Sequence, residues 1–132
     1  MSSRISGRIG EDAVIAYLKK RGHRIITANY NTGGGELDIV SVKNGVLVFT
    51  EVKTKTTVYR GAPWEELTPH KAAALKRAAA SFMRVDGTDR RVPYYVGPLR
   101  FTLGYRAHRF DLAEVCVRHG KAQQIIYTKN VL

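Results

Sequence analysis

A small set of acids and one lysine could do chemistry in this chain. Glu51 and Lys53 are separated by one residue, and Asp38 precedes them in another largely apolar run. Carboxylates in apolar surroundings are rarely buried unless they are paired or bind a metal. Mg²⁺ binds oxygen ligands, commonly one or two carboxylates together with water and substrate phosphates. Asp38 and Glu51 are therefore candidate metal ligands, with the backbone carbonyl of Val52 as a third oxygen.

Lys53 cannot be a ligand while it is protonated, but it could serve the same reaction. A lysine here could orient or help deprotonate an attacking water, or neutralise charge on a scissile phosphate. The alternative is an ordinary salt bridge between Glu51 and a neighbouring lysine, which contributes little on a solvated sheet. The companion acid Asp38 and the apolar residues 46–49 favour the metal site.

Two strands joined by a tight turn would bring these side chains together. Asn44-Gly45 between apolar runs is the strongest short hairpin signal, because both residues tolerate positive φ. Side chains two apart in a strand share a face. Glu36 therefore accompanies Asp38 and is a candidate to support the ligands from behind. The strands are expected at residues 36–42 and 46–54.

A helix expected at residues 6–21 could add a further acid. Gly22 would cap its C-terminus. Glu11 lies three and seven positions before the apolar Val14 and Leu18, on the same helical stripe. Its carboxylate could reach a pocket against the sheet, or remain solvated at a favourable place near the helix N-terminus. The pattern leaves both open.

The charge of the chain indicates its partner. The 132 residues include 22 Lys+Arg and 11 Asp+Glu, a formal net charge of +11. This excess favours a polyanion, with nucleic acid before an acidic membrane surface. No apolar run is long enough to span a membrane, no secretory signal is present, and Cys116 has no second cysteine to pair with. A cytoplasmic protein without a membrane partner is the expectation.

Basic residues after the second strand and on a second helix could contact the phosphate backbone. Thr68 suits the N-cap of that helix and Pro69 its first turn. An ordinary solvated face is the alternative explanation for the same charges. The candidates are Lys55 and Arg60 in the loop, and His70, Lys71, Lys76 and Arg77 on the outer face of the helix.

The remaining segments favour a single α/β domain over residues 1–132, with a mixed sheet flanked by helices. Residues 85–91 are polar and turn-like, and residues 92–107 mix aromatic, glycine, proline and arginine residues and are interpreted as a hairpin or long excursion. Further strands are expected at residues 23–30, 109–117 and 123–128.

With these residues assembled, the chain resembles the PD-(D/E)xK nuclease superfamily, and within it the YraN family of small predicted endonucleases. A lone aspartate followed by Glu-x-Lys would be weak, but the combination is specific over the first eighty-odd residues. The matching stretches are Gly10-Glu11, Gly35-Glu36-Leu37-Asp38-Ile39-Val40, Val48-Phe49-Thr50-Glu51-Val52-Lys53, Thr68-Pro69, Arg109-Phe110-Asp111-Leu112 and the ending from Ile125 to Leu132.

The resemblance implies a restriction-endonuclease-like core, a mixed sheet of four or five strands between helices. It implies Asp38 and Glu51 as ligands of Mg²⁺, for which Mn²⁺ could substitute, with Lys53 as the catalytic lysine and Glu11 as the acid from the helix. The layout is also similar to that of archaeal Holliday-junction resolvases, which implies branched DNA and a homodimer. Two departures are Leu37, where the superfamily name has proline, and the long segment 85–107, an insertion that puts the dimer surface in doubt.

The resulting hypothesis is a Mg²⁺-dependent endonuclease acting on nucleic acid, with DNA as the expected substrate. Two alternatives stay open at this point. One is a nucleic-acid-binding module that does not cleave, and the other is a scaffold that docks on a larger repair complex. Salt-dependent DNA binding without product would favour the first, and capture of a protein partner without DNA binding the second.

Overall fold

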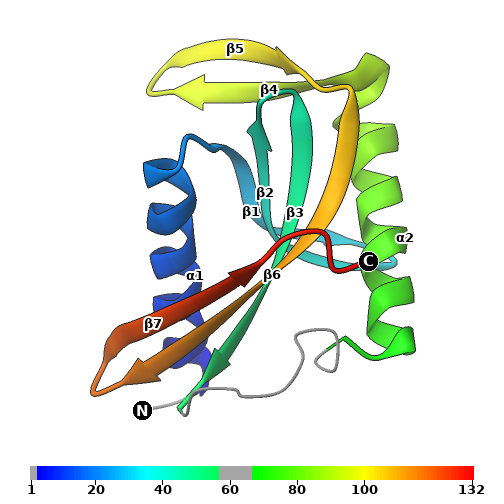
Figure 1. Cartoon of the computed structure of the whole chain (residues 1–132). Coiled ribbons are helices and arrows are strands. Elements are labelled where there is room, and N and C mark those ends of the chain that lie inside the picture. The colour runs from blue at the N-terminus through cyan, green and yellow to red at the C-terminus, as the bar shows by residue number, and fades with distance from the viewer. Residues whose placement is uncertain (1–2, 57–66) are drawn as a thin grey trace.

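The computed structural model describes residues 3–56 and 67–132 and shows a sheet between two helices (Figure 1). The helices are α1 (Ser3–Lys20) and α2 (Pro69–Val85). Five strands pair in the order β1-β2-β3-β6-β7, and β4 and β5 form a separate two-stranded sheet. The strands are β1 (Arg24–Thr32), β2 (Gly35–Lys43), β3 (Val46–Lys55), β4 (Arg91–Val96), β5 (Leu99–Gly104), β6 (Ala107–Arg118) and β7 (Lys121–Thr128).

The sheet is mixed because one pair of neighbouring strands is parallel. β3 and β6 run parallel, whereas the β1–β2, β2–β3 and β6–β7 pairs are antiparallel. The parallel partners are joined by α2 and the β4–β5 hairpin, a long crossover of the kind that parallel pairing requires. This arrangement confirms the expected α/β class and is consistent with a restriction-endonuclease-like core.

Each face of the five-stranded sheet has its own core. Val14 and Leu18 of α1 pack with Val115 of β6 on one face. Leu75 and Phe82 of α2 belong to the core of the other face, which also holds strand residues such as Leu37, Val42 and Phe49. The two helices therefore cover opposite faces, and the central strands are buried on both sides, as the apolar residues of β3 predicted.

Local chemistry explains the ends of these elements. Asn44 and Gly45 have φ values of 51° and 74°, as a tight hairpin turn with two positive φ values requires. The Thr68 hydroxyl accepts a hydrogen bond from the Lys71 N–H at 3.2 Å, and Pro69 opens α2. At the end of α1, Gly22 has a φ of 89° and its N–H bonds the Lys19 carbonyl at 3.1 Å. These three predictions from sequence are confirmed.

Several boundaries differ from those expected. α1 begins at Ser3 instead of residue 6, and the final strand begins at Lys121 instead of residue 123. The segment 85–107 contains the short helix η2 (Thr88–Arg90) and then the β4–β5 hairpin, which lies across one end of the sheet (Figure 1). No helix in the described ranges combines the length and apolar character needed to cross a membrane.

Candidate active site

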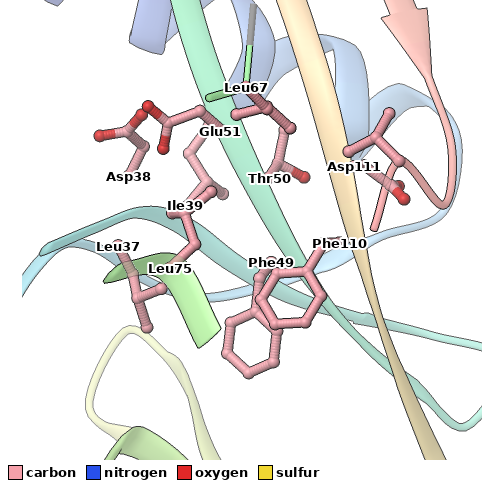
Figure 2. A pocket seen from close by; sticks show the side chains of 11 residues that line it. Leu37, Asp38, Ile39, Phe49, Thr50, Glu51, Leu67, Leu75, Phe110 and Asp111 are labelled. Atoms are coloured by element: carbon pink, nitrogen blue, oxygen red, sulfur yellow. The ribbon is translucent and has the colours of Figure 1, made fainter. Parts of the chain in front are cut away.

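The carboxyl groups of Asp38 and Glu51 lie side by side at a shallow pocket on the α2 face of the sheet (Figure 2). Both residues belong to neighbouring strands, β2 and β3, next to the last paired positions, Ile39 and Thr50. Glu51 is buried, with 9% of its surface exposed, and Asp38 is half-buried. The pocket walls beside the acids are apolar, from Leu67, Leu75 and neighbouring residues. The hairpin register predicted from Asn44-Gly45 thus brings the two acids together.

The backbone pairing of β2 with β3 ends at Ile39 and Thr50, just before the two acids. Beyond that point the Asp38 side chain, not the β2 backbone, accepts a hydrogen bond from β3. The Val52 N–H donates to Asp38 Oδ2 at 2.8 Å, a bond that a backbone carbonyl of β2 would otherwise accept. The N–H and C=O of one strand residue point to the same edge. The Val52 carbonyl therefore faces the same opened edge as Asp38, while β3 continues to pair with β6 as far as Lys55.

Two lysines accompany the acids. Lys71 Nζ lies 2.9 Å from Glu51 Oε1, and the amine of Lys53 is close enough to affect the pKa of Lys71. Burial acts to lower the pKa of Lys71, but the interactions with Lys53 and Glu51 outweigh it and the net shift is upward. We call Asp38, Glu51, Lys53 and Lys71 the acid–lysine cluster. It combines two potential cation ligands that line the pocket with two lysine amines, one of which is paired with Glu51.

The position of Lys71 corrects an expectation. It was placed on the outer face of the second helix with Lys76 and Arg77, which are exposed as expected, as is His70. Lys71 is instead the first member of the series Lys71, Leu75, Ala78 and Phe82, whose spacing of four, three and four residues follows one helical stripe. The stripe faces the sheet, so its first lysine meets the buried Glu51.

The Asp38 carboxyl is perturbed by this environment. Burial and, next, the charge of Glu51 raise the pKa of Asp38 from 3.8 to about 7, and the bond from Val52 N–H only partly opposes this. A carboxyl group whose ionisation is resisted by a second acid is relieved when a cation binds between the two. The available ligands are two carboxylates and the backbone carbonyl of Val52. These oxygen donors fit a hard divalent cation such as Mg²⁺.

Glu11 lies near this pair without joining it. Its charge contributes to the raised pKa of Asp38, yet the described residues contain no group of three or more acids, histidines or cysteines close enough to hold one ion. Burial raises the pKa of Glu11, a hydrogen bond with Asn29 opposes this, and the charge of Glu36 adds to it. Glu36, expected to support the pair, is exposed on β2, and its charge acts on Glu11.

Two further residues at the site carried a signal that the sequence interpretation did not use. Glu114 on β6 is 5% exposed, pairs in register with Lys53, and binds Lys55 at 3.2 Å. It is an acid inside an apolar strand, the same signal that pointed to Glu51. Asn29 has a φ of 54° and lies between the paired positions of β1 that flank Asp38, a backbone conformation that asparagine tolerates.

Two other candidate basic residues were expected in the loop that follows β3. Lys55, expected to hold phosphate, is half-buried against Glu114. Arg60 lies outside the described residues. Asp111 also lines the pocket, but its carboxylate is engaged in structural bonds: it accepts from the Tyr127 hydroxyl at 2.5 Å, the Asn130 N–H at 2.9 Å and Arg109 Nε at 3.0 Å.

Comparison with known proteins adds family relationships to this geometry. The model of the uncharacterised protein family UPF0102 matches residues 10–115. A UPF0102 protein of Syntrophomonas wolfei is 34% identical over 117 residues, which cover 89% of each chain. A UPF0102 protein of Alkaliphilus metalliredigens is 34% identical over 128 residues, which cover 97% of each chain. A third, from Acidothermus cellulolyticus, is 35% identical over 123 residues, which cover 93% of this chain and 89% of the relative.

Proposed function

Since the chain belongs to the uncharacterised protein family UPF0102, the family expected as YraN from its motifs, its activity must be argued from the site, and we propose that it is a metal-dependent endonuclease acting on nucleic acid. The observation that carries the proposal is the pair of neighbouring carboxyl groups, Asp38 and Glu51, at the opened edge of β2 and β3. Burial and, next, the charge of Glu51 raise the pKa of Asp38 to about 7, a perturbation typical of functional sites.

Asp38 and Glu51 are the residues that would hold Mg²⁺ or Mn²⁺, with the Val52 carbonyl on the same edge. When bound, the cation would supply Lewis-acid activation of water and of a phosphate oxygen. The chain's own part is to hold two carboxylates in place: the Val52 N–H fixes Asp38 at 2.8 Å, and Lys71 fixes Glu51 at 2.9 Å. Ligands held in this way need little rearrangement when the cation and substrate arrive.

The lysines give the site a role for phosphate. Lys53 and Lys71 place two amines beside the acids, where they could contact a phosphodiester or steady a water molecule. The net charge of +11 supports a polyanionic substrate, and DNA is the form that we propose. Glu11, whose charge reaches Asp38 from α1, would tune the site or support a second ion.

The test is a cleavage assay on labelled DNA substrates: single-stranded, duplex, forked and four-way, with Mg²⁺ or Mn²⁺. We expect product from the wild type and at least about a hundredfold loss in Glu51→Gln, because one ligand is removed. Asp12→Asn is the matched control, since Asp12 is an exposed acid next to Glu11 on α1. Equal cleavage by wild type and Glu51→Gln would reject the site.

One observation favours a second candidate function. The Lys71–Glu51 pair already gives one of the two acids a positively charged partner without any metal. A nucleic-acid-binding module that does not cleave would show this arrangement too. Binding that falls steeply with salt, with no product from any DNA structure or metal, would favour this module over the nuclease.

A further inference from the structure

The β4–β5 hairpin carries exposed apolar side chains that no part of the described chain covers. Its strands pair Val92 with Leu103, Tyr94 with Phe101 and Val96 with Leu99, and directly opposed residues in a sheet share a face. Val92 is fully buried and Leu103 partly packed in the core of the α2 face, so the base of this face is anchored. Toward the tip the same face is open, with Phe101 47%, Val96 50% and Leu99 59% exposed.

We call this face of the hairpin the underside, and basic groups lie next to it. The Arg24 guanidinium is 5.8 Å from the centre of the Tyr94 ring. A hollow of about 320 Å³ separates the hairpin base from the β2–β3 turn, and its lining includes Arg24, Lys43 and Leu103. Residues 91–107 contain no acid, and Arg91 and Arg100 lie on the opposite face of the hairpin. The aromatic and apolar side chains of the underside thus lie next to two basic residues, Arg24 and Lys43.

This combination fits one kind of partner. Aromatic rings stack on the faces of bases, and cationic side chains hold the phosphates between them. Only unpaired bases offer a free face, because the bases of a duplex cover one another. A second copy of this chain fits less well, since each copy carries a net charge of +11 and two copies would repel each other.

We propose that the hairpin underside and the hollow beside it bind a single-stranded segment of nucleic acid, with Phe101 and Tyr94 stacking on bases and Arg24 and Lys43 holding phosphates. The inference rests on the proposed function only in taking nucleic acid as the partner. The turn residue Asn44 borders the hollow, and Asp38 lies six residues back along β2. At about 3.3 Å per residue the two places are about 20 Å apart, so the hairpin would recognise substrate without touching the reacting bond.

Binding to fluorescein-labelled oligonucleotides, measured by anisotropy in EDTA, tests this without cleavage. The probes are a 15-nucleotide single strand and a 15-base-pair duplex. We expect Phe101→Ser to bind the single strand about tenfold more weakly, the loss of one base stack, with duplex binding unchanged. Tyr95→Ser is the matched control, because Tyr95 is 60% exposed and faces away from the underside, where it pairs with Arg100. Both variants remove exposed side chains, and thermal unfolding checks that they fold.

Three results would overturn the inference. Phe101→Ser and Tyr95→Ser could behave alike, or Phe101→Ser could weaken both probes equally. Alternatively, sedimentation could reveal a dimer that Phe101→Ser abolishes while single-strand binding persists, which would assign the underside to a second copy. The outcomes also separate the two proposals. Strand-selective binding without any cleavage leaves the hairpin inference standing alone, and cleavage with an unaffected Phe101→Ser variant leaves the nuclease standing alone.

Discussion

Asp38→Asn should make the metal-free protein more stable at alkaline pH, which is unusual for a change at a half-buried polar residue. The pKa of Asp38 is raised from 3.8 to about 7 by burial and then by Glu51. Between these values the folded protein binds a proton that the unfolded chain releases. The free energy of unfolding therefore falls as the pH rises from about 4 to about 7, and the full penalty is present above pH 7.

The size of the effect follows from the pKa. Each tenfold change in proton affinity corresponds to about 1.4 kcal/mol, so the full displacement would correspond to about 4 kcal/mol. Asp38 keeps some contact with solvent, and Lys71 beside Glu51 offsets part of the repulsion. We therefore expect about 2 kcal/mol, or about 7 °C in Tm for a chain of this length. Asparagine keeps an oxygen for the Val52 N–H, so the substitution removes the charge and preserves the bond.

The assay is urea and thermal unfolding of both proteins in EDTA at pH 4.5 and pH 8. The variant should match the wild type at pH 4.5 and exceed it at pH 8, and Asp12→Asn should show no such change between the two pH values. Adding Mg²⁺ at pH 8 should stabilise the wild type by mass action and leave Asp38→Asn unaffected. A variant that is less stable than the wild type at pH 8, or equally offset at both pH values, would refute the electrostatic argument.

Three further predictions concern the residues around the site. Lys71→Met should lower the free energy of unfolding at pH 8 by about 1–2 kcal/mol, because buried Glu51 loses its partner, and saturating Mg²⁺ should restore it; a loss that Mg²⁺ does not repair would mean that the cation does not bind at Glu51. Burial lowers the pKa of His23 from 6.5 to about 4, so stability should decline as the pH falls through this window, and an NMR titration of the imidazole with a midpoint above 6 would contradict it. In Gly10→Ala the new Cβ would lie 2.5 Å from Thr54 Oγ1, which should cost about 1–2 kcal/mol in urea unfolding. Thr54→Ala in the same chain should recover most of that loss, whereas simple additivity would count against the contact.

The parts of the fold that local chemistry dictates were the parts that the sequence predicted. Asn44-Gly45 and Thr68-Pro69 specify their turn and helix start through φ preference and hydrogen bonding of a few adjacent residues. Once the turn is placed, the strand period alone brings Asp38 opposite Glu51. Half of the candidate site could therefore be derived without coordinates.

Longer-range features had no such signal. The parallel pairing of Lys53 with Glu114 joins residues some sixty positions apart. The sequence of neither strand indicates which other strand it will pair with. Lys71 was expected on the outer face of the helix, but it lies four residues before the buried Leu75 and therefore on the same side of the helix.

The opened edge between β2 and β3 gives the Asp38 carboxylate a structural role in addition to its proposed role as a metal ligand. A ladder that ends inside the molecule leaves a backbone N–H without a strand partner, and an orphaned buried N–H is costly. Asp38 accepts the bond from Val52, so the fold requires an oxygen at this position whether or not a metal ever binds. The charge on that oxygen is a separate matter, because burial and Glu51 oppose it. The two substitutions thus test different properties of Asp38. Asp38→Asn removes only the negative charge, whereas Asp38→Ala also leaves the Val52 N–H without its hydrogen-bond acceptor. Loss of activity in the alanine variant alone would report on folding, and only loss in the asparagine variant identifies a ligand.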